Sequence, residues 1–156
     1  MTRHNRETQS AKYALRHWQF YEENFQHLAG RVKKNAVCLF KALKQLRPEE
    51  ARLLAERYYK SKQKANFSYR IGEYTTVTPR SYEEIATTLN MTEKQVGKNL
   101  RIVERKLGNI IIELELENEP KERKKTIDQL TTIISQSNFS PEEKEFLLRD
   151  LDQLKQ

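Results

Sequence analysis

The stretch SYEEIATTLNMTEKQVGKNLRIVERKLG, residues 81–108, predicts two helices joined by a tight turn. Ser81 can cap the first helix, and the Glu three residues later completes a capping box. Asn90 predicts the corner between the helices, because Asn tolerates the left-handed backbone that ends a helix sharply. Thr92 and Gln95 form a second capping box, which begins the second helix. Two capped helices around so short a turn are typical of a helix-turn-helix.

The second helix of this pair has an apolar stripe and a polar open face. Val96, Leu100, Val103 and Leu107 recur at spacings of four, three and four. Amides and cations occupy the other faces, and these side chains bind base edges and phosphates in DNA. The predicted base contacts are Gln95, Lys98, Asn99 and Arg101, and the predicted phosphate contacts are Thr92, Lys94 and Arg105. Any two amphipathic helices with a turn share this pattern, so the pattern alone leaves a structural role open.

The segment LRPEEARLLAERYYK, which starts at Leu46, precedes this motif, and together they resemble region four of bacterial sigma factors. In that family a helix opened by a Leu-x-Pro-x-Glu-like start ends in Arg-Tyr and leads to a helix-turn-helix. The resemblance is carried by Leu46, Pro48, Glu49, Leu53, Leu54, Arg57 and Tyr58, and then by Tyr82, Glu83, Glu84, Ile85, Ala86, Leu89, Met91, Thr92, Val96, Leu100, Arg105, Lys106 and Leu107. LuxR-like regulators and small phage or plasmid activators share this motif. The resemblance implies a transcription protein that binds promoter DNA, with RNA polymerase as a further partner.

The chain departs from a complete sigma factor in two ways. Only 45 residues precede Leu46, which is too few for the domain with which sigma factors bind polymerase and melt DNA. The interval from Lys60 to Arg80 is also longer than the usual connection before the helix-turn-helix. The chain is therefore more similar to stand-alone region-four proteins, such as phage late-gene activators of the ArpU kind. We accordingly expect a phage or mobile-element origin.

Composition favours a mainly all-α, cytoplasmic protein. The 156 residues include only four Gly and four Pro, and this scarcity favours helices over an all-β fold. Cys38 is the single cysteine, so no internal disulfide can form and a reducing compartment is expected. No apolar run is long enough to cross a membrane, and the N-terminus has no signal-peptide core.

Charge is segregated along the chain, whose net charge is +7. Lys and Arg outnumber Asp and Glu by 10 to 3 in residues 1–47 and by 12 to 8 in residues 48–108, whereas residues 109–156 have 7 against 11. We therefore expect three parts: basic N-terminal helices, a region-four-like DNA-binding domain with an insertion at 60–80, and an acidic C-terminal helical hairpin. The basic front suits contact with a polyanion such as double-stranded DNA.

The first part of the chain predicts an arm and two helices. Residues 1–11 show no periodicity and predict a mobile basic arm. An aromatic stripe from Ala14 to Leu28 predicts a helix that ends near Gly30. A second apolar face predicts another helix from Arg31 to Leu46.

The insertion predicts a small β-hairpin at about 67–78. Aromatic and β-branched residues alternate on both sides of Gly72-Glu73, which is typical of a two-residue turn with Gly first. If the hairpin forms, we expect it beside the DNA-binding helix. The predicted phosphate contacts of the insertion are Lys62, Lys64 and Arg70. A solvated loop is the alternative.

Beyond Leu107 the apolar stripe predicts that the second helix extends to about Glu117 and stops before Pro120. The alternation of apolar residues and Glu from Ile112 to Glu117 would also fit a strand, but nothing breaks the chain between Gly108 and Pro120, which favours the helix. Two further helices are expected, one around Ile127–Ile134 and one capped at Ser140. They would form a hairpin that either covers the domain or pairs with a second copy or another protein. A homodimer through these helices is therefore left open.

No motif in the sequence indicates an enzyme, a metal site or a cofactor. The three His residues lie within the first 27 positions, without metal-ligand spacing to one another or to Cys38. No glycine loop for phosphate and no pairing of nucleophile and base is recognisable. The sequence favours a sequence-specific DNA-binding transcriptional regulator. The alternative is a protein-interaction module that binds RNA polymerase or another regulator with little DNA contact, and a nonspecific nucleic-acid binder ranks third.

Overall fold

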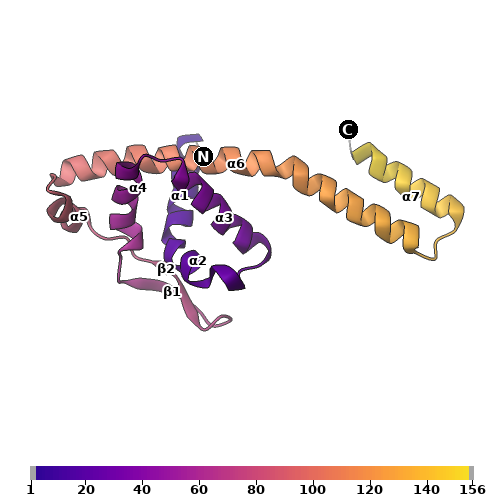
Figure 1. The fold of residues 1–156 in the computed structure, drawn as a ribbon, viewed down its shortest axis with the longest axis horizontal. Helices are drawn as coiled ribbons and strands as arrows, with labels where there is room; N and C mark the ends of the chain where they lie inside the picture. The colour runs from indigo at the N-terminus through magenta and orange to yellow at the C-terminus, as the bar shows by residue number, and fades with distance from the viewer. Residues whose placement is uncertain (1–2, 155–156) are drawn as a thin grey trace. The chain divides into compact units, whose positions relative to one another are not determined.

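The computed structural model describes residues 3–154 and is mainly helical, with one small β-hairpin (Figure 1). The mainly all-α fold and the hairpin in the insertion are thus confirmed. The elements in chain order are α1 (Arg3–Arg16), α2 (Trp18–Asn24), the 3₁₀ turn η1 (Phe25–His27), α3 (Gly30–Lys44), α4 (Pro48–Leu54), the π-helical turn η2 (Ala55–Tyr59), β1 (Lys64–Ser68), β2 (Glu73–Val77), α5 (Tyr82–Leu89), α6 (Glu93–Gln136) and α7 (Pro141–Leu154).

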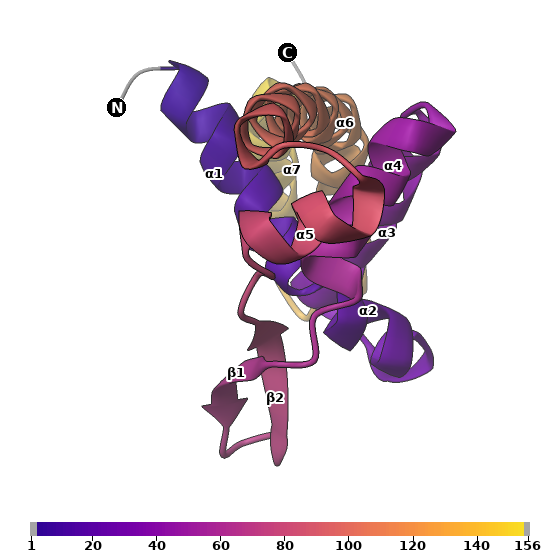
Figure 2. The same ribbon diagram turned by 90° about the vertical axis from the view of Figure 1, so that its left-hand side faces the viewer.

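The chain divides into two compact units, Met1–Leu114 and Glu115–Gln156, and each is described by itself. The first unit has one continuous core, to which every helix from α1 to α6 contributes. Its fully buried side chains include Ala11, Leu15, Tyr21, Ala36, Leu39, Leu54, Tyr58, Ile85, Leu100 and Leu107. The predicted N-terminal part, residues 1–47, therefore shares its core with residues 48–108. Figure 2 looks along the first part of α6, with α1 on one side of it and α4 on the other.

Helix α1 replaces the predicted mobile arm, so that prediction is wrong for residues 3–11; residues 1–2 lie outside the described part. Ala11 and Leu15 of α1 are fully buried. The backbone of α1 passes so close to α6 that a Cβ built on Gly108 would lie 1.9 Å from the carbonyl oxygen of Glu7. Only a glycine permits this approach. Packing against α6, and not local periodicity, orders the start of the chain.

The predicted aromatic helix from Ala14 to Leu28 is interrupted at His17, where α1 ends and α2 begins. The Nδ1 atom of His17 lies 2.7 Å from the carbonyl oxygen of Tyr13, one turn earlier. After this corner Trp18 packs on Tyr59, with ring centres 5.1 Å apart. Because of this corner, the aromatic residues before and after His17 lie on two helices of different direction, α1 and α2.

The β-hairpin pairs β1 with β2 in antiparallel register, with Phe67 opposite Tyr74. The predicted two-residue turn at Gly72-Glu73 is wrong, because Ser68 pairs with Glu73 and leaves a four-residue loop. Gly72 closes this loop with φ +78° and donates its N–H to Ser68 at 2.7 Å. The predicted position beside the second helix is also wrong. In Figures 1 and 2 other helices of the unit separate the hairpin from α6.

Helix α6 continues through Pro120 to Gln136, so the predicted stop near Glu117 is wrong. Proline strains a helix because its ring removes an N–H and crowds the preceding turn. Here both flanks consist mostly of Glu, Lys and Arg, which are strong helix formers and sustain the helix.

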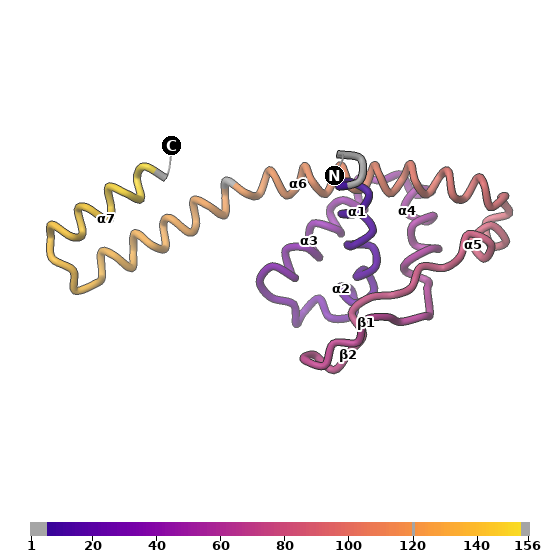
Figure 3. Tube along the Cα trace, turned by 180° about the vertical axis from the view of Figure 1, so that it is seen from behind, coloured from indigo at the N-terminus to yellow at the C-terminus, as the bar shows by residue number. Residues whose placement is uncertain are grey.

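The second unit is a helical hairpin formed by the end of α6 and by α7, which run antiparallel (Figure 3). Ser140 and Glu143 form the predicted capping box, with bonds of 3.2 and 3.0 Å. Ile127 of α6 and Leu151 of α7 are buried. No helix in the described part of the chain combines the length and apolar character that a membrane span requires.

Candidate nucleic-acid interface

The turn between α5 and α6 is built from the predicted caps. The Ser81 hydroxyl accepts the Glu84 N–H at 3.2 Å, but the Glu84 carboxylate contacts Arg80, so only half of the capping box predicted there forms. Asn90 has φ 54° and ψ 49°, the left-handed conformation expected at this corner. Thr92 and Gln95 make both bonds of the second capping box, at 3.1 and 3.0 Å. Three residues thus join α5 to α6, with the start of α6 fixed by hydrogen bonds.

The first turns of α6 present two opposite faces. Val96, Leu100, Val103 and Leu107 are buried in the core. Lys94, Lys98, Arg101 and Arg105 are exposed, and each lies two positions before one of these apolar residues. Two positions correspond to a rotation of about 200° in a helix, so the cations lie on the opposite side from the core. We call these four cations the basic stripe.

Arg105, at the end of the basic stripe, also contacts α1. Its Nε lies 3.6 Å from Glu7 Oε2. Glu7 is almost fully buried, whereas the Arg105 side chain is half exposed. The Asn109 amide, oriented with its nitrogen toward Glu7, donates to the same carboxylate at 2.7 Å. Arg105 therefore combines an exposed position with an ion pair that holds α1.

The other two predicted base contacts, Gln95 and Asn99, are engaged by neighbouring parts of the protein. The Gln95 side-chain oxygen accepts the Thr92 N–H, so Gln95 serves as a cap. Asn99 is half buried and lines a groove toward α4. Lys98 and Arg101 are exposed, and Arg101 Nε donates to the Gly97 carbonyl one turn earlier. The open face of α6 is therefore mainly cationic.

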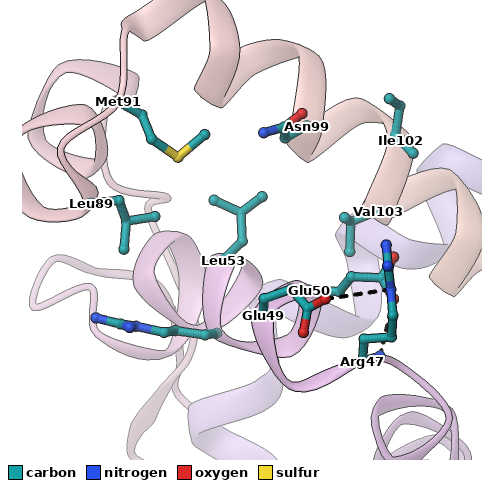
Figure 4. A pocket seen from close by; sticks show the side chains of 10 residues that line it. Arg47, Glu49, Glu50, Leu53, Leu89, Met91, Asn99, Ile102 and Val103 are labelled. Carbon is teal, nitrogen blue, oxygen red and sulfur yellow. Dashed lines mark hydrogen bonds and ion pairs between the residues drawn. The ribbon is translucent and has the colours of Figure 1, made fainter.

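The groove beside Asn99 lies between α4, the α5–α6 turn and α6, with a volume of about 510 Å³. Figure 4 shows Met91, Asn99 and Leu53 pointing toward one another across it. The lining residues are Arg47, Glu49, Glu50, Arg52, Leu53, Leu89, Met91, Asn99, Ile102 and Val103. The floor is apolar and the rim near the start of α4 is charged.

The predicted phosphate contacts of the insertion lie apart from the basic stripe. Lys64 donates to Gln19 Oε1 at 2.6 Å and lies 3.6 Å from Glu23, so it binds α2. Lys62 and Arg70 are exposed, but they belong to the hairpin region that other helices separate from α6.

A buried ionic network, which the sequence did not predict, fixes α5 to η2. Arg80 contacts the Glu56 carboxylate at 2.9 Å and that of Glu84 at 3.2 Å. Burial acts to raise the pKa of Glu56, but hydrogen bonds and charge from Lys60 and Arg80 outweigh it and lower the pKa. Glu56 is therefore a buried carboxylate that holds the segment before α5 in place.

The pair Arg57-Tyr58, which the family resemblance includes, connects η2 to α5 and α6. The Tyr58 hydroxyl donates to Glu104 at 2.8 Å, and burial raises the pKa of Tyr58, so it stays protonated. The Arg57 guanidinium lies 4.7 Å from the centre of the Tyr82 ring. A Cβ built on Gly97 would lie 3.1 Å from the same ring. Gly97 is therefore buried where α5 crosses α6, although it falls on the helix predicted to bind DNA.

A second ion pair fixes α4 to α6. Lys106 donates to Glu50 Oε1 at 2.8 Å, and the Arg47 N–H donates to the same oxygen at 3.0 Å. The hydrogen bond from Lys106 is the main cause that lowers the pKa of Glu50, against an opposing effect of burial. Elements on three sides thus hold α6 in place while its basic stripe stays open.

Among the described residues no group of His, Cys, Asp and Glu has the geometry of a metal site. These features define a mainly helical protein in which the second of two capped helices, α6, presents a row of cations. Comparison of the chain with protein-family models, curated proteins and solved structures gave no match. A functional proposal therefore rests on the geometry of this chain.

Proposed function

We propose that the protein is a sequence-specific DNA-binding transcriptional regulator in which α6 enters the major groove. The observation that supports this most is the basic stripe, which lies opposite the core on a helix fixed by caps and ion pairs. The major groove of B-DNA is wide enough to admit one α-helix. Residues 1–114 have 22 Lys and Arg against 12 Asp and Glu, and this excess favours binding to a polyanion.

In this proposal Lys98 and Arg101 contact base edges, because Lys and Arg both bind the major-groove edge of guanine. Lys94 and Arg105, at the two ends of the stripe, contact phosphates. Thr92 lies at the N-terminus of α6, where the amides of the first turn that the capping box does not use suit a phosphate oxygen. Phosphate contacts supply affinity and base contacts supply specificity. The proposed function is DNA binding and involves no catalysis.

The test begins with selection of bound duplexes from a random pool. The selected duplex and a scrambled one are then titrated by fluorescence anisotropy at two salt concentrations. We expect at least about a thousandfold preference for the selected duplex. In the double variant Lys98→Ala/Arg101→Ala we expect a specific affinity at least 30-fold weaker, since each base contact contributes about 1–3 kcal/mol. Lys94→Ala should instead weaken binding to both duplexes and reduce the salt slope by about one.

The matched control is Lys41→Ala/Lys44→Ala, which removes the same charge from the exposed surface of α3. Circular dichroism of each variant verifies that the fold is intact. Equal losses in the two double variants would mean that only bulk charge matters, and equal affinity for both duplexes would indicate nonspecific binding. Either result contradicts the proposal.

The alternative is a protein-interaction module, and the groove beside Asn99 favours it. An apolar floor of Leu53, Leu89 and Val103 with a charged rim is a surface that a protein segment could occupy. RNA polymerase is the partner that the sequence resemblance implies. If Lys98→Ala/Arg101→Ala leaves duplex affinity and its salt dependence unchanged, this alternative replaces the main proposal. For either function we propose a cytoplasmic location, where both duplex DNA and polymerase are present in bacteria.

A further inference from the structure

The C-terminal unit exposes more large apolar side chains than it buries. Among its described residues Ile127 and Leu151 are buried, whereas Leu130 is 41%, Ile133 63% and Phe146 64% exposed. Leu, Ile and Phe have no polar group that water could bind, so a cluster of them at the surface indicates a contact surface. We call Leu130, Ile133 and Phe146 the C-terminal patch.

Helical geometry places these three side chains on one side of the hairpin. Measured from Ile127 around α6, Leu130 and Ile133 are rotated by about 60° and 120° in one sense. Measured from Leu151 around α7, Phe146 is rotated by about 140° in the same sense. Because the two helices run antiparallel, rotations of equal sense lead to the same side of the pair. The C-terminal patch is therefore one surface.

The charge of this unit argues against nucleic acid as the partner. Residues 115–156 have 7 Lys and Arg against 10 Asp and Glu. A net negative unit repels phosphates, whereas an apolar patch on a helical hairpin suits other helices. The surface that covers the patch is therefore expected to be protein.

We propose that the C-terminal patch binds the same patch of a second copy of this chain and forms a homodimer. Two helical hairpins that face each other make a four-helix bundle, which gives every helix a second neighbour. Two-fold symmetry makes each contact twice, so one small patch supplies the whole interface. Two copies also match in length, because each contributes the 14 residues of α7 and the stretch of α6 beside it.

The size of the patch fits a weak dimer. An aromatic side chain such as Phe buries about 150–250 Å² and Leu or Ile roughly the lower end of that range, so the exposed parts of the three residues leave on the order of 300 Å² in water. Two copies would bury about 600 Å² of apolar surface, which corresponds to roughly 900 Å² in all if the interface is about 65% apolar. This approaches the roughly 1,000 Å² of a small specific interface. We therefore expect a dissociation constant in the micromolar range, on the order of 1–100 μM.

The experiment measures the mass of the full chain by sedimentation equilibrium from 1 to 200 μM. The wild-type protein should approach twice 18.6 kDa as the concentration rises. Ile133→Glu should remain at 18.6 kDa, or dimerise at least 30-fold more weakly, because it buries a charge in the interface. The matched control is Thr132→Glu, which adds the same charge at the exposed neighbouring position, rotated to the other side of α6. That variant should dimerise like the wild type.

Each outcome decides the proposal, and none depends on whether the chain binds DNA. Ile133 and Thr132 are both exposed, so neither substitution disturbs the core, and circular dichroism verifies this. A wild-type monomer at 200 μM overturns the proposal and leaves the patch to a different protein. A dimer that persists in Ile133→Glu, or one that is lost equally in Thr132→Glu, overturns it as well.

Discussion

Replacing Gly108 with Ala tests whether α1 is a packed helix of this fold. A Cβ at this position would lie 1.9 Å from the Glu7 carbonyl oxygen and 2.5 Å from the carbonyl carbon. Ordinary contact begins near 3.4 Å, so the α1 backbone must move by roughly 1.5 Å, the difference between the two distances. Ala11 and Leu15, both fully buried, would lose part of their contacts in that movement.

The expected magnitude follows from two opposing effects. Alanine favours the helix over glycine by about 1 kcal/mol. Overpacking against a backbone costs about 1–3 kcal/mol, and partial loss of the buried Leu15 side chain adds about 1–2 kcal/mol. We therefore expect Gly108→Ala to lower the free energy of unfolding by about 1–4 kcal/mol. This corresponds to a fall of about 2–16 °C in melting temperature for a chain of this size, at about 2–4 °C per kcal/mol.

Gly97→Ala is the matched control, because Gly97 lies in the same helix and is also buried. Its Cβ would meet the edge of the Tyr82 ring at 3.1 Å. That side chain is 38% exposed and can give way by a few tenths of an ångström. The gain in helix propensity and this contact should nearly cancel, within about 1 kcal/mol of zero. Urea unfolding of both variants, with amide hydrogen exchange in α1, makes the comparison. If Gly108→Ala is as stable as Gly97→Ala and exchange in α1 is unchanged, α1 does not pack on α6 as described.

Two further predictions concern an ion pair and a hydrogen bond that hold α6. The lowered pKa of Glu50 means that its contribution to stability is present above the ordinary carboxyl pKa and is lost as pH falls through the native pKa. Lys106→Met should therefore destabilise the protein at pH 7 and flatten the fall in urea midpoint between about pH 5 and 3; an unchanged profile would contradict the pairing. Tyr58→Phe should cost about 1–3 kcal/mol, because it removes the hydrogen bond to the buried Glu104 and leaves that carboxylate with the Arg57 Nε, 3.9 Å away. Tyr74→Phe, at a half-exposed ring of the hairpin, should change stability by less than about 0.5 kcal/mol.

The parts of the fold that could be predicted are set by residues close to one another in the sequence. A capping box needs two side chains three residues apart, so the pairs at Thr92 and Ser140 could be recognised from the sequence alone. The same holds for Asn90, whose left-handed backbone reflects a local preference. The apolar stripe of α6 could also be found, because core packing repeats with the period of the helix.

The parts that were wrong depend on contacts between distant segments. Nothing near residues 1–11 indicates a helix, because α1 is held by Gly108 and Arg105 of α6. The turn of the hairpin was misplaced because strand register, and not the preference of Gly72, sets the length of the loop. Pro120 was expected to end a helix, but the strong helix formers on both sides outweigh it.

The same distinction explains why the ten predicted contact residues do not lie together. Lys94, Lys98, Arg101 and Arg105 share the periodicity of the core but are shifted by two positions, and they form one row. Asn99 was predicted to contact a base because its amide can bind adenine, but its position in the helix directs its side chain toward α4. Lys64 was included for its charge, and it instead binds α2. The position of a cation in the helical repeat therefore predicts the surface on which it lies better than its residue type does. For this reason the substitutions proposed for DNA binding are made at residues of the basic stripe.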